Sequence, residues 1–262
     1  AREGPMTSLP PPSAKKLGLV IDLDTCVGCQ ACATSCKEWN TQGYSAPLTD
    51  ANPYGKDPIG TWLNRVHAYE MDTGDAQQIV HFPRSCLHCE TPACVTVCPT
   101  GASYKRAEDG IVLVNPDTCI GCKLCSWACP YGAREYDVQE GVMRKCTLCV
   151  DRIYNENFAE EDRIPACVRA CPTSARHYGD LGDPNSDVSK LVKERGGFDL
   201  LPEMGRAGLF ALAVPVAQGG LGGLCRGALD DPDGRNAIGE RLQGNQGNGL
   251  RADGPAAMAP GR

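Results

Sequence analysis

The chain has 262 residues, of which 17 are cysteine, 30 glycine and 20 proline, while only 6% are aromatic. Its formal net charge of −6 gives no support for nucleic-acid binding. The most apolar run, residues 207–217, is interrupted by Pro215 and is shorter than the roughly 20 residues that cross a bilayer.

The N-terminal segment is rich in proline. Residues 1–16 show neither the regions of a secretory signal peptide nor a twin-arginine motif, so we expect a flexible arm. The apolar run Leu17–Leu23 follows and predicts a strand that leads into the first cysteine group.

Most of the cysteines form four groups, and such clustering favours metal binding over a disulfide framework. The first and third groups have the spacing C-x2-C-x2-C-x3-C, and the second has C-x2-C-x4-C-x3-C. In the fourth group the middle gap grows to seventeen residues. In chain order the groups are Cys26, Cys29, Cys32 and Cys36; Cys86, Cys89, Cys94 and Cys98; Cys119, Cys122, Cys125 and Cys129; and Cys146, Cys149, Cys167 and Cys171.

The spacing has a chemical reason. Three closely spaced cysteines in a turning loop can direct their sulfurs at three irons of one cubane cluster, and a helical turn carries the fourth toward a neighbouring cluster. A zinc site would favour separate C-x2-C pairs instead. The sequence therefore predicts four 4Fe–4S clusters with all sixteen grouped cysteines as iron ligands.

Two segments recur along the chain. Asp24–Cys29 returns as Asp117–Cys122, and Cys98–Ala102 is similar to Cys171–Ala175. We therefore predict a loop-rich α+β fold over residues 17–202, in which a bacterial-type two-cluster ferredoxin is duplicated, with short β-hairpins and loop insertions.

Residues 40–85 form the longest insertion, which we expect to provide a docking surface. Three hairpins are predicted, two of them around Asp109-Gly110 and Glu140-Gly141 turns: Thr61–Met71 with Gln77–Phe82, Ser103–Arg106 with Ile111–Val114, and Arg134–Val138 with Val142–Lys145. Pro184–Arg195, followed by two glycines, predicts a helix.

Residues 203–262 are dominated by glycine, alanine, arginine and aspartate, with no aromatic residue after Phe210, which predicts a disordered tail. A divergent extension and a shifted reading frame would both produce this composition. Cys225 lies alone in this tail and is assigned no ligand role.

Several residues near the groups have two interpretations. His88 either donates a hydrogen bond to a cluster sulfur or packs at the loop surface, and the second is preferred. Trp39 and Trp127 are expected to shield clusters from water. No nucleophile–base pair or nucleotide-binding loop is evident, so no catalytic residue is predicted. Three basic side chains are expected to be solvent exposed: Arg134, Lys145 and Arg152.

With these groups, including the stretched gap between Cys149 and Cys167, the chain resembles the iron–sulfur subunit of the complex molybdopterin oxidoreductases. That family includes dimethyl sulfoxide, polysulfide, thiosulfate and tetrathionate reductases. The resemblance covers about residues 17–200. Four stretches are similar to the membrane-bound sulfite dehydrogenase branch: Cys36–Asn40, Gly60–Val66, Ser85–Glu90 and Lys145–Arg152.

The resemblance implies that the outer groups share two clusters and the inner groups share two. Cys125, which some relatives replace, is present, so four clusters are expected. The implied ligand sets are Cys26, Cys29, Cys32 and Cys171; Cys146, Cys149, Cys167 and Cys36; Cys86, Cys89, Cys94 and Cys129; and Cys119, Cys122, Cys125 and Cys98.

The resemblance also implies the partners, which are a molybdopterin-containing catalytic subunit and an integral membrane anchor subunit. The chain would pass single electrons between them, from sulfite toward quinone, and would bind no nucleic acid. We expect it at the cytoplasmic face of the inner membrane, with a periplasmic location through co-export left open. Two alternatives stand: the same role in a quinol-driven polysulfide, thiosulfate or dimethyl sulfoxide reductase, and a free-standing polyferredoxin.

Overall fold

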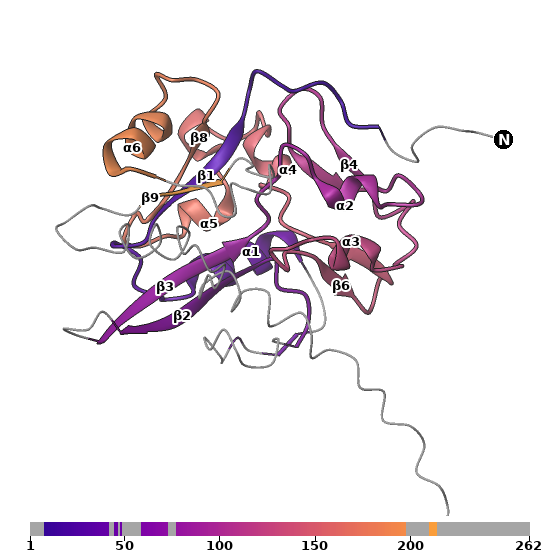
Figure 1. The fold of residues 1–262 in the computed structure, drawn as a ribbon, viewed down its shortest axis with the longest axis horizontal. Coiled ribbons are helices and arrows are strands. Elements are labelled where there is room, and N and C mark those ends of the chain that lie inside the picture. Colours follow the sequence, from indigo (N-terminus) through magenta and orange to yellow (C-terminus); the bar gives the residue numbers. More distant parts are fainter. Residues whose placement is uncertain are drawn as a thin grey trace, which may run out of the picture.

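The computed structural model of the chain describes residues 8–41, 45–46, 48, 59–72, 77–197 and 210–213. Short helices and strands alternate along these ranges (Figure 1). The strands are β1 (Leu17–Asp22), β2 (Asn64–Asp72), β3 (Gln77–Ser85), β4 (Ser103–Lys105), β5 (Val112–Val114), β6 (Glu135–Asp137), β7 (Val142–Arg144), β8 (Arg176–Asp180) and β9 (Phe210–Ala213). The helices are α1 (Ala31–Asn40), α2 (Ala93–Thr96), α3 (Leu124–Trp127), α4 (Val150–Ile153), α5 (Ala166–Arg169) and α6 (Asp187–Arg195), with a 3₁₀ turn at Glu160–Asp162.

Strand β1 is the central strand of a mixed sheet, in the order β8-β1-β9. It pairs antiparallel with β8, Leu19 opposite Tyr178, and parallel with β9. Every residue of β1 is buried, which explains why Leu17–Ile21 contains no polar side chain. Because β1 precedes the first cysteine group and β8 follows the fourth, their pairing brings the outer groups together.

Three two-stranded hairpins complete the sheets, namely β2–β3, β4–β5 and β6–β7. They confirm the three predicted hairpins, two of which were predicted around turn signals, although the strands of the last two are shorter than predicted. In Figure 1, α6 and the β1 sheet lie at one side of the molecule, and β4, α2, α3 and β6 lie at the other. The fold therefore has two ends, each built around cysteine loops.

Helix α6 begins at Asp187, three residues after Pro184, because Ser186 caps its N-terminus by accepting a hydrogen bond from Ser189 N. Its C-terminal cap is Gly196, as the sequence predicts, with a left-handed φ of 61°. Val188 packs on Val20 of β1, so the helix covers one face of the sheet.

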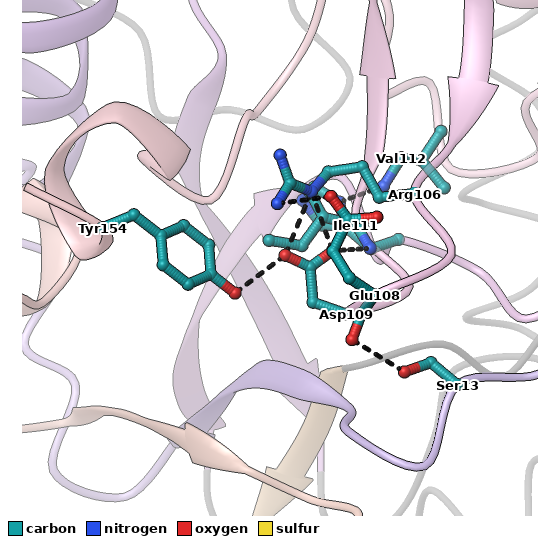
Figure 2. Close-up of polar contacts among 8 residues, drawn as sticks. Ser13, Arg106, Glu108, Asp109, Ile111, Val112 and Tyr154 are labelled. Carbon is teal, nitrogen blue, oxygen red and sulfur yellow. Dashed lines mark hydrogen bonds and ion pairs between the residues drawn. The ribbon is translucent and has the colours of Figure 1, made fainter.

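A buried carboxylate ties the β4–β5 hairpin to distant segments (Figure 2). Asp109 accepts hydrogen bonds from Arg106 Nε at 3.0 Å and from the Tyr154 hydroxyl at 2.8 Å. Ser13 donates to the Glu108 carbonyl at 3.0 Å. Tyr154 follows α4, so this network fixes the hairpin against the fourth group, and part of the expected N-terminal arm lies along the domain.

Strand β9 differs from expectation. The tail of residues 203–262 was expected to lack regular structure, yet Phe210–Ala213 pairs with β1. The physical reason is that β1 offers a second edge whose unpaired peptide groups accept a short apolar segment. Residues 203–209 and 214–262, including Cys225, lie outside the described residues, as does part of the 40–85 insertion.

Candidate iron–sulfur site

The cysteine loops share a left-handed turn directly before their second cysteine. Gly28 and Gly121 take this position in the first and third groups, with φ of 69° and 65°, while His88 and Leu148 take it in the second and fourth. The turn points backbone N–H groups at the first cysteine of a loop, since His88 N and Leu148 N each lie 3.4 Å from the sulfur two residues earlier. Such successive amides form an anion-binding concavity.

Besides its left-handed φ, a steric contact favours glycine at Gly121. A side chain there would collide with the carbonyl of Gly141 in the turn between β6 and β7. The third cysteine loop therefore lies directly against this hairpin.

One set of four predicted ligands lines a single cavity. Cys98, Cys119, Cys122 and Cys125 surround it, together with apolar residues that include Met143. Burial, Cys94, Cys119 and Cys98 raise the pKa of Cys125 to about 11, against an opposing effect of Arg134.

The structure brings a second set together in the same way. Cys89 is half-buried beside Cys86, Cys94 and Cys129, and burial, followed by these three thiolates, raises its pKa to about 12. The set joins the second group to the last cysteine of the third.

The outer groups meet in two further sets. Burial and then Cys146, Cys167 and Cys149 raise the pKa of Cys36 well above its ordinary value. At the first loop, burial is the main reason that the pKa of Cys26 is raised, with smaller contributions from Cys32 and Cys171. Cys29 lies in the same loop and is exposed.

Neighbouring sets also influence one another electrostatically. After burial, the thiolate of Cys86 in the second group helps to raise the pKa of Cys146 in the fourth, and the thiolate of Cys32 in the first group helps to raise that of Cys167. Cys94 of the second group likewise contributes, after burial, to the raised pKa of Cys125 in the third. The exposed members, Cys29 and Cys122, belong to the sets at the two ends of this series.

The last cysteines of groups two and four accept equivalent hydrogen bonds, each from donors in its own loop. Burial opposes ionisation of Cys98, but the backbone N–H of Ser103 at 3.3 Å, the Thr100 hydroxyl and backbone N–H groups of Thr100 and Ala102 lower its pKa. Cys171 has the same surroundings, with Thr173 and the amide of Arg176, and its pKa is also lowered. The recurring Cys-Pro-Thr segment therefore stabilises a thiolate.

Sequence reasoning placed several buried side chains wrongly at the surface. His88, expected at the loop surface, is 2% exposed, and its Nδ1 accepts a hydrogen bond from Val112 N at 3.1 Å. Arg134 and Lys145 are buried as well. Their burial depends on packing between distant groups, which the local sequence does not encode.

Burial and three nearby cations lower the pKa of His88 far below its ordinary value, so the imidazole is neutral. The cations are those of Lys145, Arg134 and Lys105. Lys105 donates to the carbonyl of Glu90 at 2.8 Å and pairs with its carboxylate at 3.2 Å.

One of the two tryptophans also differs from expectation. Trp127 is 70% exposed, so it does not shield a cysteine set. Trp39 is 39% exposed and donates a hydrogen bond to Asp151 at 2.9 Å. Arg152, expected at the surface, stacks over the Trp39 ring. Sequence reasoning missed Arg176, whose signal is its position five residues after Cys171, matching Arg134 after Cys129.

These surroundings fit an anionic iron–sulfur cluster. The sixteen grouped cysteines are free thiols, backbone amides point at their sulfurs, and buried cations lie among them with N–H groups that have no partner in the described ranges. An oxidised 4Fe–4S core with four thiolates carries a net charge of roughly −2, which such donors and cations compensate. A cavity lined only by apolar, neutral groups would not compensate the negative charge of such a cluster.

Short helices, hairpins and cysteine loops of this kind define a ferredoxin-type 4Fe–4S electron-transfer protein. Residues 77–181 match a family described as 4Fe-4S dicluster domain, and residues 23–39 match a 4Fe-4S binding domain. The chain therefore binds 4Fe–4S clusters.

Comparison with similar proteins identifies the family within this class of electron-transfer proteins. The sulfite dehydrogenase B subunit of Allochromatium vinosum is 62% identical over 190 residues, which are 72% of this chain and 79% of that one. A putative dimethyl sulfoxide reductase iron-sulfur protein of Halobacterium salinarum, the B subunit, is 38% identical, over 72% and 75% of the two chains. The tetrathionate reductase B subunit of Salmonella typhimurium is 35% identical, over 68% and 64%. The chain belongs to this family of iron–sulfur electron-transfer subunits of oxidoreductases.

Across the described ranges, none of the helices has both the length and the apolar character that crossing a membrane requires.

Proposed function

We propose that the chain carries four 4Fe–4S clusters and relays electrons within a sulfite-oxidising complex. The observation that supports this most directly is the gathering of the cysteines into four sets that influence one another electrostatically in series, with the exposed Cys29 and Cys122 in the sets at its two ends. When bound, the clusters supply one-electron transfer, and the exposed ends are where partners would exchange electrons with the series.

The proposed ligands follow the four sets. Each cluster takes three thiolates from one group and its fourth from another, so that the fold is two interleaved two-cluster ferredoxins. The proximity of Cys26 to Cys171 and the shared cavity of Cys98 with the third group support this sharing. The sets are Cys26, Cys29, Cys32 and Cys171 (set A); Cys36, Cys146, Cys149 and Cys167 (set B); Cys86, Cys89, Cys94 and Cys129 (set C); and Cys98, Cys119, Cys122 and Cys125 (set D).

The proposed partners are a molybdopterin-containing catalytic subunit and an integral membrane anchor that reacts with quinone. The complex would lie at the cytoplasmic face of the inner membrane, and electrons would run from sulfite to quinone. The 62% identity to the sulfite dehydrogenase relative supports this substrate.

Iron and sulfide analysis of the anaerobically purified chain tests the cluster number. We expect four clusters per chain, and loss of one cluster in Cys171→Ser, because that residue closes set A across most of the sequence. Cys225→Ser is the matched control and should keep the full iron content. An unchanged iron content in Cys171→Ser would contradict the ligand assignment.

The intact complex tests the substrate. Sulfite should reduce an artificial electron acceptor in the complex that contains this chain. The second candidate is a quinol-driven reductase, favoured by the relatives named for dimethyl sulfoxide reductase and tetrathionate reductase. Turnover with those acceptors and none with sulfite would establish the second candidate instead.

A further inference from the structure

Two buried arginines occupy equivalent places in the cysteine pattern. Arg134 lies five residues after Cys129, and Arg176 lies five residues after Cys171. They are 5% and 3% exposed. Burial of a guanidinium is costly unless its charge and its N–H groups have partners. The surroundings of both residues therefore identify the groups that compensate the buried charge.

Arg134 lies between sets C and D. Its Nη2 donates to the Cys94 sulfur at 2.6 Å and to the Ser103 hydroxyl at 2.8 Å. Ser103 in turn donates its backbone N–H to the Cys98 sulfur at 3.3 Å. Burial opposes the charge of Arg134, but thiolates of Cys94, Cys86 and Cys125 outweigh it and raise its pKa. Those thiolates come from both sets.

Arg176 has the same position between sets A and B. Its Nη2 donates to Asn64 Oδ1 at 2.8 Å. Its charge also opposes the effect of burial on the pKa of Cys167. Cys167, Cys36 and Cys146 of set B and Cys32 of set A raise its pKa against the effect of burial.

Neither guanidinium is satisfied by protein groups alone. Nη1 of Arg134, and Nε and Nη1 of Arg176, are buried and have no hydrogen-bond partner in the described part of the chain. The charges that act on both arginines are those of cysteine sulfurs. Buried N–H groups without partners, beside three thiolates at Arg134 and four at Arg176, point to an anionic ligand that accepts them.

We propose that Arg134 and Arg176 each hold one pair of neighbouring clusters, by donating N–H groups to sulfurs of both and by placing a fixed positive charge between them. Arg134 would bind the clusters of sets C and D, and Arg176 would bind those of sets A and B. This inference rests on the proposed four-cluster function. Reduction adds negative charge to a cluster, so a nearby cation raises the reduction potential of both members of its pair.

Redox titration monitored by electron paramagnetic resonance tests this in the cluster-loaded full chain. In Arg134→Gln, two of the four reduction steps should move to lower potential by a tenfold or larger change in equilibrium constant, about 59 mV for a one-electron couple. Arg176→Gln should move the other two. Lysine keeps the charge but loses the planar fork of donors, so Arg134→Lys should shift the same two steps by less.

Arg169→Gln is the matched control. Arg169 follows Cys167 by two residues, but its side chain is 59% exposed and pairs with Asp162 at 2.8 Å. Its loss should leave all four steps within experimental error. Equal shifts in Arg134→Gln and Arg169→Gln, or a shift spread evenly over four clusters, would overturn the proposal.

A measurement on the unmodified chain decides the case if the glutamine variants lose clusters. With arginine labelled by ¹⁵N in the guanidinium, pulsed electron paramagnetic resonance of the reduced protein should show coupling between arginine nitrogen and cluster spin. No such coupling, in a chain whose iron content is that of four clusters, would overturn the role of the arginines and leave the proposed function intact. An iron content below four clusters would instead contradict the proposed function.

Discussion

The side chain of Asp109 shows how one buried charge joins segments far apart in the sequence. It is fully buried, and it accepts hydrogen bonds from Arg106, from the backbone N–H of Ile111 at 3.1 Å and from the Tyr154 hydroxyl (Figure 2). Hydrogen bonds to a charged group contribute more than neutral ones, roughly 1.5–3 kcal/mol each. The hairpin that precedes the third cysteine group is therefore held in place by one carboxylate.

Replacing Asp109 with asparagine should lower the free energy of unfolding by about 1.5–3 kcal/mol, because it removes the charge and one acceptor. Thermal and denaturant unfolding of the cluster-loaded protein measure the change. Glu108→Gln is the control, since Glu108 contacts Arg106 at 2.8 Å with a side chain 61% exposed, and exposed ion pairs contribute less than about 1 kcal/mol. Equal stability of the two variants would refute the role given to Asp109.

The hydroxyl of Tyr154 should ionise at a higher pH than that of an ordinary tyrosine. Burial, followed by its hydrogen bond to Asp109, raises the pKa of Tyr154 to about 12. A raised pKa in the folded state means that its contribution to stability is complete below the ordinary value of about 10 and is lost between pH 10 and 12. Tyrosinate absorbance, compared between the unmodified chain and Tyr154→Phe, should show one tyrosine that ionises near pH 12. A difference spectrum centred at pH 10 would contradict this.

At the scale of elements, the third cysteine loop depends on the β6–β7 hairpin. Gly121 has a left-handed φ, its position leaves no room for a Cβ beside the Gly141 carbonyl, and Tyr136 lies 3.1 Å from where that Cβ would be. The loop and the turn are therefore in contact through their backbones.

Gly121→Ala should lower the iron content by the cluster of set D, because the loop cannot keep its place against the hairpin. Gly141→Ala is the control: Gly141 also has a left-handed φ of 71°, but nothing lies within 4 Å of an added Cβ. That control should cost only about 1–2 kcal/mol of backbone strain and keep all clusters. Iron analysis and unfolding curves of both variants measure this, and equal behaviour would show that the hairpin is not needed.

At the scale of the whole molecule, the predicted ligands are part of the hydrophobic core. Cys32, Cys129 and Cys167 belong to the same buried cluster as Leu19 and Ile21. With 30 glycines and few aromatic residues, the chain has limited apolar material beyond these thiols, so cluster binding should contribute much of the folding free energy.

Removal of iron with a chelator under oxidising conditions should therefore abolish most of the far-ultraviolet circular dichroism of the folded chain. Buried thiols and buried cations such as Arg176 would lose the anion that compensates them. The loaded protein in the same buffer is the control, and reconstitution with iron and sulfide should restore the signal. A native spectrum after complete loss of iron would show that the polypeptide folds alone.

Local sequence was sufficient to predict the cysteine loops, the three hairpins and α6, because ligand spacing, strand-like segments, turns that end in glycine and helix caps are properties of consecutive residues. It was also sufficient for the family, through the long gap between Cys149 and Cys167. Long-range packing was needed to establish that β9 joins β1, that His88 and Lys145 are buried, and that Arg134 and Arg176 lie between cysteine sets. These features depend on contacts between groups that are far apart in the chain, where burial follows from packing and not from the neighbouring sequence.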